Sequence, residues 1–284
     1  MPPLDTVVHL RANTLVSDRN MAVARLAEAG YTVEGVPWCA EALTVRGASA
    51  SELAALPDFE RGAFFIQNHA SLLPVLALDP QPGEAVLDLC AAPGGKTTHI
   101  AALMQNTGTL VANDISQQRV YKLANVLRQY GVTCARTSRM AGHLLWRRYP
   151  EHFDRALVDA PCSMRGTAEP SPSEVKSLAK QQRYLLKSAL SATRPGGVMV
   201  YSTCTTTAEE NEAVIAWLLE KHPGEVAVEP FDLPGAPLAP ALAHDAKGRP
   251  FPPTIALTRR ILPGEEMDGF FVARLRKLET DVDV

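Results

Sequence analysis

The sequence predicts an α/β fold in which helices cover both faces of a mostly parallel sheet. From about residue 67 onward, apolar strands and helical segments alternate along the chain. The strands are apolar almost without interruption, which is typical of parallel strands buried on both faces. A glycine-rich turn at residues 90–97 links the first of these strands to a helix. We therefore expect a large domain at residues 67–284 and a small α/β domain at residues 1–66.

The small N-terminal domain is expected to combine short strands with one clear helix. The helix at residues 19–29 ends at Gly30, a residue that favours helix termination. Residues 64–66 lead into the main domain. The remaining expected elements are strands at 7–11, 31–36 and 43–46 and a short helix at 51–56.

The main domain is expected to contain five strands and five helices in alternation. The expected strands are 85–89, 109–113, 132–135, 155–158 and 197–202, and the expected helices are 70–77, 97–105, 117–130, 173–192 and 208–221. Residues 226–231 and 269–275 are predicted to close the sheet as a hairpin-like pair. Between them, residues 230–263 hold eight of the 22 prolines. A loop of that length predicts either a functional lid or a surface excursion.

Composition narrows the class of protein. The 284 residues are 46% hydrophobic, which is enough for a buried core. No apolar run approaches the length of a membrane span, and residues 1–5 do not begin a signal peptide. The five cysteines are odd in number and form no CxxC pair, which argues against a disulfide framework or a zinc site. We expect a reduced cytoplasmic protein, monomeric and without a metal or a membrane partner.

Charge is unevenly distributed in a chain whose net charge is −3. Residues 136–194 contain eleven basic and five acidic side chains. A local positive excess suits a polyanionic substrate such as nucleic acid. For the lysines and arginine of residues 176–187, a solvated helix face is an equally good interpretation.

The turn at residues 90–97 predicts a cofactor pocket. Gly94 and Gly95 lack Cβ atoms, so the backbone can approach a ligand, and the N–H groups of the following helix favour an anionic group. Asp114 ends the next strand, where it is placed to accept hydrogen bonds from ribose hydroxyls. The turn matches neither GxGxxG nor GxxxxGK[ST], which disfavours an ATPase. A glycine turn followed by an acid also fits NAD-binding proteins.

Two cysteines stand at the carboxyl ends of predicted strands. Cys162 and Cys204 are each followed by polar loop residues, whereas Cys39, Cys134 and Cys90 fit the usual role of small core residues. Methylation of cytosine at C5 requires a thiolate that adds at C6 and makes C5 nucleophilic. Asp159, three residues before Cys162, is placed to hold the edge of the ring. The pattern therefore indicates covalent chemistry on a heterocyclic base.

Three motifs together resemble those of the Nol/Nop/Sun (RsmB/RsmF-type) RNA cytosine-C5 methyltransferases, especially the bacterial RsmF type that modifies small-subunit ribosomal RNA. They are DLCAAPGGKT at residues 88–97, DAPCS at 159–163, and YSTCT at 201–205 followed by AEENE. The resemblance covers most of the chain and is highly specific. It implies S-adenosylmethionine (SAM) as cofactor, RNA as substrate, and a SAM-dependent methyltransferase fold, Rossmann-like with a seven-stranded sheet. It also implies that the small N-terminal domain is RRM-like and contacts RNA.

The resemblance also implies a role for each matching residue. Cys204 matches the nucleophile and Cys162 the cysteine that assists product release, while Asp159 and Lys96 belong to the active site. The implied cofactor residues are Cys90, Ala91, Ala92, Pro93, Gly94, Gly95, Lys96, Asp114, Arg119 and Asp159.

The chain departs from the family pattern at three places. Ala141 stands where the family usually has an aspartate that contacts the adenine side of SAM. The loop at residues 162–166 reads Cys-Ser-Met-Arg-Gly instead of Cys-Ser-Gly-x-Gly. The sequence ends soon after residue 277, without the C-terminal RNA-binding domain of many relatives, which leaves open an RNA target other than theirs.

Two alternatives to methylation of ribosomal RNA remain open. One is the same chemistry on transfer RNA or another RNA. The other is an RNA-binding or ribosome-assembly factor with little turnover, which Ala141 favours and the retained cysteines and Asp159 disfavour. A dinucleotide oxidoreductase leaves both cysteines unexplained.

Overall fold

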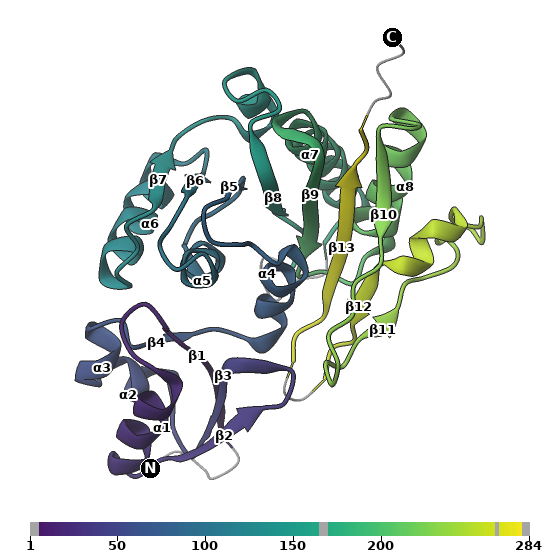
Figure 1. The fold of residues 1–284 in the computed structure, drawn as a ribbon. Helices are drawn as coiled ribbons and strands as arrows, with labels where there is room; N and C mark the ends of the chain where they lie inside the picture. Colours follow the sequence, from purple (N-terminus) through teal and green to yellow (C-terminus); the bar gives the residue numbers. More distant parts are fainter. Residues whose placement is uncertain (1–5, 165–169, 265–266, 280–284) are drawn as a thin grey trace.

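The structure is a computed structural model that describes residues 6–164, 170–264 and 267–279. Its N-terminal part is a four-stranded antiparallel sheet with strand order β2-β3-β1-β4, shown at the bottom of Figure 1. The elements are β1 (Val7–Ala12), α1 (Arg19–Glu28), β2 (Thr32–Val36), β3 (Cys39–Arg46), α2 (Ala50–Ala54), α3 (Pro57–Glu60) and β4 (Phe64–Ile66). Residues 64–66, expected only as a connection, pair with β1 because Leu10 faces Ile66 in an antiparallel ladder.

The large sheet has nine strands in the order β11-β12-β13-β9-β8-β5-β6-β7, with β10 paired to β13. Its parallel part consists of β5 (Ala85–Asp88), β6 (Thr109–Asn113), β7 (Ala135–Ser138), β8 (Phe153–Asp159) and β9 (Thr193–Thr203). The expected closing pair is confirmed, because β10 (Val226–Glu229) runs antiparallel to β13 (Phe270–Lys277). These seven strands give the expected α/β fold, and β11 (Ala239–Pro240) and β12 (Arg259–Ile261) extend it.

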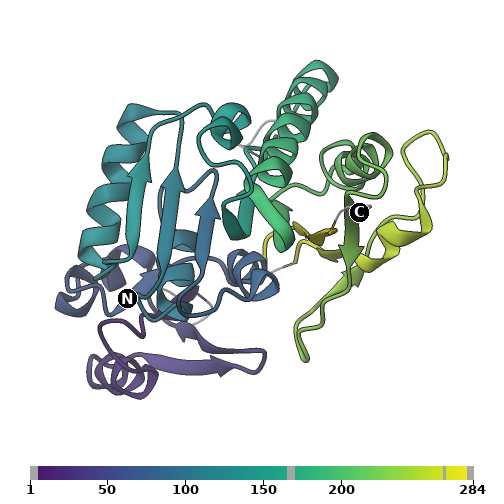
Figure 2. The same cartoon turned by 45° about the horizontal axis from the view of Figure 1, so that its top comes forward.

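Helices cover both faces of this sheet, as the apolar strands predict. On β5, Val86 packs with the helices of one face and Leu87 with those of the other, and both side chains are fully buried. One face carries α4 (Leu73–Leu78) and α5 (Gly95–Leu103), with α6 (Gln117–Gln129) beside α5. The other face carries α7 (Pro172–Ala192) and α8 (Glu212–Lys221), which lie side by side in Figure 2.

Four expected elements differ in the structure. The strand expected at 132–135 begins at Ala135, because Val132 N–H donates to the end of α6 at Leu127 and Thr133 N–H donates to Asn106. The helix at 70–77 is divided into a 3-10 turn, η1 (His69–Leu72), and α4. The helix at 208–221 is likewise divided into η3 (Ala208–Glu210) and α8, because Asn211 leaves the helical conformation. The proline-rich segment contains β11, η4 (Pro253–Leu257) and β12.

Buried polar side chains join the two sheets. Asn13 Nδ2 donates to the carbonyls of Gly62 (2.8 Å) and Tyr130 (3.0 Å). The guanidinium of Arg11, itself fully buried, donates to Thr98 Oγ1 on α5 at 2.8 Å. These bonds fix the N-terminal sheet against the helices α5 and α6, beneath the large sheet in Figure 1. Within the described ranges, no helix is both long and apolar enough to cross a bilayer.

Candidate active site

The carboxyl ends of β5, β6, β8 and β9 meet around one cavity of about 320 Å³. Parallel strands end at the same edge of a sheet, so loops that are distant in sequence converge there. The cavity is lined by Leu89, Cys90, Ala92, Asn113, Asp114, Ile115, Arg119, Gly142, His143, Asp159, Ala160, Pro161, Cys162, Leu178, Gln181, Leu185 and Cys204. The structure thus brings Cys90, Asp114, Arg119, Asp159 and both predicted cysteines to one place.

The glycine turn depends on backbone geometry that other residues rarely adopt. Gly94 has a φ of +121°, and a Cβ atom there would lie 2.9 Å from Val126 on α6. The turn therefore packs tightly against α6, while Cys90 and Ala92 at its start line the cavity.

Asp88 forms a hydrogen bond to the last residue of the glycine turn. It ends β5, and its Oδ2 accepts a hydrogen bond from Thr97 Oγ1 at 2.7 Å. Burial raises the pKa of the Asp88 carboxyl to about 7. Its Oδ1 is buried without a partner among the described residues, so it is available to an incoming donor.

Asp114 and Arg119 form one unit at the end of β6. Asp114 is 3% exposed, and its Oδ1 accepts a hydrogen bond from Ser116 N–H at 2.9 Å. Its Oδ2 lies 3.1 Å from Arg119 Nη1, and Arg119 Nη2 donates to the carbonyl of Ala92. Arg119 therefore links the acid to the glycine turn, and a carboxylate held in this way is suited to accept hydrogen bonds from a ribose diol.

Lys96 and Asp159 form an ion pair at the centre of the site. Lys96 Nζ lies 2.8 Å from Asp159 Oδ2, and the ammonium is 5.4 Å from the ring of Phe270. Asp159 Oδ1 accepts a hydrogen bond from Ser202 Oγ at 2.8 Å. Both oxygens of Asp159 thus have partners, which fixes the carboxylate at the mouth of β8.

The two cysteines lie in contact at the ends of β8 and β9. Their Sγ atoms are 3.0 Å apart; Cys162 is buried and Cys204 is exposed. The hydrogen bond from the Cys162 thiol lowers the pKa of Cys204, and nearby Lys96 lowers it further. The same contact, together with burial, raises the pKa of Cys162. Cys204 is therefore the member of the pair that ionises more readily.

The segment between Cys204 and α8 connects the two loops that carry the cysteines. The α8 helix begins only at Glu212, and the intervening residues hold the two cysteine loops together. Glu210 Oε2 accepts hydrogen bonds from Ser163 N–H (3.2 Å) and Gln182 Nε2 (2.7 Å), and Gln182 also donates to Pro161 O.

Asn211 forms hydrogen bonds to the residues on both sides of Cys204. Its Oδ1 accepts from Thr203 Oγ1, and its Nδ2 donates to Thr205 O at 2.8 Å. The residues of AEENE therefore bridge both loops that carry a cysteine.

The end of the cavity near Ala141 differs from the family pattern in its chemistry. Ala141 precedes the 3-10 helix η2 (Gly142–Arg147), and Gly142 and His143 line the cavity. A Cβ atom on Gly142 would lie 2.6 Å from Leu185, so glycine permits the close approach of α7. Ile115, 67% exposed, also lines the cavity. This end offers apolar and histidine side chains in place of the expected acid.

Several residues that line or support the cavity were not predicted from the sequence. Leu178, Gln181 and Leu185 come from α7, and their helical spacing gave no sign of which face meets the cavity. Gln182 and Glu210 are paired across 28 residues, a distance that no local pattern reveals. Of the loop at 162–166, Arg165 and Gly166 lie outside the described residues.

A second hollow of about 300 Å³ lies on the opposite side of the glycine turn, where it faces the N-terminal sheet. Phe65, Gln67 and Asn68 line it together with Lys96, and Cys90, Ala92 and Asp159 line both hollows. Ala91, Pro93 and Gly95 of the predicted turn face this second hollow. Cys90 lies half-buried between the two hollows. Of the three cysteines expected in the core, Cys39 is buried, whereas Cys90 and Cys134 are only partly buried.

The fold, with its cavity at the carboxyl ends of the parallel strands, is that of the SAM-dependent methyltransferases. A crystal structure of a methyltransferase homologue from Pyrococcus horikoshii superposes with a TM-score of 0.85 at 35% identity, covering 97% of this chain and 87% of that one. NSun6 from the same organism, determined with the ligand SFG, shares the fold with a TM-score of 0.81 at 23% identity, covering 98% of this chain and 92% of that one.

Comparison of sequences gives the family. Residues 75–276 match the family model for the 16S rRNA methyltransferase RsmB/F, and the chain belongs to this family. Ribosomal RNA small subunit methyltransferase F from Klebsiella pneumoniae is 37% identical over 94% of this chain, and that from Escherichia coli O127:H6 is 38% identical over 95%. The chain spans 57% of the length of each of these relatives.

Proposed function

We propose that the protein transfers a methyl group from SAM to C5 of a cytosine in RNA, with small-subunit ribosomal RNA as the substrate. The observation that carries this proposal is the pair of thiols in contact at 3.0 Å, in the same cavity as Asp114 and beside the Lys96–Asp159 ion pair. Two thiols with opposite pKa shifts suit a reaction in which one adds to a ring and the other acts later.

The residues present fit the proposed cofactor. Asp114 is placed to accept hydrogen bonds from the ribose, and the unpartnered Asp88 Oδ1 and Lys96 Nζ offer complementary groups to an amino acid moiety. SAM bound in this way supplies an electrophilic methyl group. Ile115 and Leu178 give the cavity an apolar wall, which suits a heterocyclic base.

Cys204 is the proposed nucleophile. Its thiolate adds to C6 of cytosine, and the electron pair of the C5–C6 double bond is displaced toward C5 and the ring, so that C5 becomes nucleophilic. Asp159, held by Lys96 and Ser202, is placed to hydrogen-bond the ring edge. After C5 has gained its methyl group, loss of the C5 proton restores the double bond and expels Cys204 as a thiolate.

Cys162 is proposed to act in this last stage. Its pKa is raised, so it remains a thiol while Cys204 attacks. It lies within 3.0 Å of the sulfur that must leave, and therefore beside the ring carbons. From this position the Cys162 thiol gives its proton to the departing Cys204 thiolate, and the Cys162 thiolate formed in this way accepts the C5 proton.

Covalent trapping tests this division of roles. Cys162→Ala, mixed with RNA and SAM, is expected to give a protein–RNA species that survives denaturing electrophoresis, because the adduct forms but does not break down. Cys204→Ala is expected to abolish methyl transfer and to form no adduct, while it retains SAM binding. The double variant is the control and should trap nothing. An adduct with Cys204→Ala instead would reverse the roles.

The substrate class rests on the relatives, whose names specify the small subunit of the ribosome. Mass mapping of methylated cytosines in RNA from cells with and without the protein tests it directly. A missing 5-methylcytosine in transfer RNA or another RNA would move the same chemistry to that substrate.

Ala141 favours a second candidate, an RNA-binding assembly factor without turnover, because the usual acid at the adenine end is absent. Calorimetry with SAM separates the two functions. Micromolar binding supports the enzyme, and no detectable heat supports the assembly factor.

A further inference from the structure

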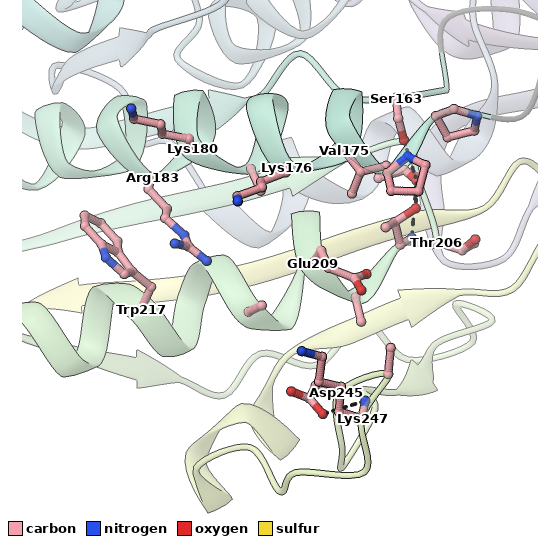
Figure 3. Close-up of a pocket in the computed structure, with 18 of the residues that line it drawn as sticks. Ser163, Val175, Lys176, Lys180, Arg183, Thr206, Glu209, Trp217, Asp245 and Lys247 are labelled. Carbon is pink, nitrogen blue, oxygen red and sulfur yellow. Dashed lines mark hydrogen bonds between the residues drawn. The ribbon is translucent and has the colours of Figure 1, made fainter.

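A long groove of about 1190 Å³ lies outside the cavity, between α7, the start of α8 and the turn at residues 245–251. Figure 3 shows its two sides: Lys176, Lys180 and Arg183 project from α7, and Lys247 projects from the turn opposite. Trp217 of α8 lies at one end and Thr206 at the other. None of the proposed catalytic residues lines this groove.

The groove begins where the catalytic cavity ends. Ser163 follows Cys162 in the chain and Thr205 follows Cys204, and both line the groove. Their hydroxyl oxygens lie 3.4 Å apart, so these two side chains form the boundary between cavity and groove. A strand whose base enters the cavity therefore has a continuous path across this boundary into the groove.

The charged side chains of the groove favour an anion. Lys176, Lys180 and Lys247 are exposed, and none forms an ion pair with a described residue. Among the described residues, the acids that line it are Glu209 and Asp245, and Asp245 is already paired with Arg249 at 2.6 Å. Lys176, Lys180 and Arg183 follow the i, i+4, i+7 spacing of one helix face and extend over about 10 Å. A polynucleotide strand carries more than one phosphate over that length.

The groove also offers aromatic surfaces. Arg183 lies over the ring of Trp217 at 5.8 Å, and Tyr184 is 49% exposed. A cation and an indole in one wall form a surface on which an unpaired base stacks. Together with the lysines, this combination is typical of sites for single-stranded nucleic acid.

We propose that this groove binds the single-stranded RNA segment that flanks the target cytosine. The lysines contact its phosphates, and Trp217 with Arg183 stacks against one of its bases. This inference rests on the proposed RNA activity and assigns the path of the strand outside the cavity. It also divides the basic residues of 136–194 into those that face the groove and those that stabilise the fold. Arg155 forms an ion pair with Glu84 at 2.7 Å, and Arg194 forms one with Asp154 at 2.7 Å.

Salt-dependent binding of a short fluorescein-labelled single-stranded RNA with one central cytosine tests the phosphate contacts. The triple variant Lys176→Ala, Lys180→Ala, Lys247→Ala should bind at least roughly tenfold more weakly at low salt. Its slope of log affinity against log salt should fall by about two, since each lost phosphate contact in a single strand removes about 0.7. The matched control is Arg128→Ala, Arg147→Ala, Arg148→Ala, which removes the same charge from exposed positions outside the groove. Equal losses in both triple variants would overturn the proposal.

Tryptophan fluorescence tests the stacking contact independently. The chain has three tryptophans, so Trp38→Phe with Trp146→Phe leaves Trp217 as the sole reporter, and Trp38→Phe with Trp217→Phe leaves Trp146. The same RNA without its label should quench Trp217 and leave Trp146 unchanged. No quenching of Trp217 at saturating RNA would overturn the assignment of the groove. So would an acidic peptide that competes as well as the RNA, because it would make the occupant a protein segment.

The measurements distinguish a failure of the groove assignment from a failure of the proposed function. SAM binding, measured by calorimetry, should be the same in the lysine triple variant and the wild type. If the wild type methylates RNA and the triple variant binds RNA normally, the groove is wrong and the function stands. If the groove binds RNA and no cytosine is methylated, the function fails and the groove stands.

Discussion

Asp114 combines burial with charge at the end of β6. Because its Oδ2 is held by Arg119 and its Oδ1 by Ser116 N–H, the carboxylate is oriented before any ligand arrives. Charge-assisted hydrogen bonds contribute roughly 1.5–3 kcal/mol, so Asp114→Ala should weaken SAM binding by about one to two orders of magnitude. Calorimetry measures the change, and Asp79→Ala serves as a control outside the cavity. An unchanged dissociation constant would show that Asp114 does not contact the cofactor.

Asp88 makes stability depend on pH. Its pKa is about 7 in the folded protein, against an ordinary value of 3.8, so between these values the folded chain holds a proton that the unfolded chain has lost. Its contribution to the free energy of unfolding is therefore full at low pH and is lost as pH rises toward about 7. From about pH 5 to pH 7 the loss is at most about 3 kcal/mol.

Urea denaturation of the wild type and Asp88→Asn isolates this contribution. The amide cannot ionise, so the variant should lack this decrease in the free energy of unfolding between pH 5 and pH 7. Parallel pH profiles for the two proteins would mean that the Asp88 carboxyl does not hold a proton in the fold.

At the scale of the element, Glu210 in η3 holds the loop that carries Cys162. It bonds both Ser163 N–H and Gln182, and Gln182 in turn holds Pro161 O. Glu210→Ala should displace the Cys162 loop and lower the rate of methyl transfer by about 10². SAM binding should change little, because Glu210 does not line the cavity.

Two comparisons show whether Glu210 positions the loop or only stabilises the fold. Glu210→Gln keeps an acceptor oxygen and should recover part of the rate, while Glu220→Ala, exposed on α8, should have no effect. A loss in Glu210→Ala that reflects only a lower fraction of folded protein would contradict the positioning role.

Elements were predictable where burial and sequence period coincide. The strands at 85–89 and 109–113 are short apolar runs buried on both faces, and β5 and β6 lie within those ranges. The prediction for β7 began too early. Val132 and Thr133 are β-branched residues typical of strands, but their N–H groups donate hydrogen bonds to α6 and to Asn106 instead of to a neighbouring strand. The interruption at Asn211 was not predictable, since it depends on Thr203 and Thr205 of another element.

The candidate site follows the same division. Asp114, Asp159, Cys162 and Cys204 were predictable as candidates because each stands at the end of a strand, where local sequence already indicates the sheet edge, and the structure brings all four to one cavity. The contribution of α7 to the cavity depends on how the helix packs, and the closeness of the two thiols depends on strand order. Neither of these features can be predicted from a short segment of the sequence.

At the scale of the whole molecule, Asn13 joins the N-terminal sheet to the large one. The side chain is fully buried, donates to the carbonyls of Gly62 and Tyr130, and accepts a hydrogen bond from Leu15 N–H at 3.2 Å. The Tyr130 hydroxyl adds a further bond to Phe64 O at 3.1 Å. The position of the N-terminal sheet therefore depends on a few buried polar groups whose loss cannot be compensated by water.

Asn13→Ala should lower the free energy of unfolding by about 2–3 kcal/mol, because it leaves buried carbonyls without donors. Urea denaturation measures this loss, and Asn125→Ala is the control. Among the described residues, that amide bonds to exposed Arg128 alone, so its removal should cost less than about 0.5 kcal/mol. If the two sheets separate before the large sheet unfolds, limited proteolysis of Asn13→Ala should release the large-sheet fragment while SAM binding persists. A loss of stability equal to that of Asn125→Ala would show that packing alone, and not Asn13, holds the two sheets together.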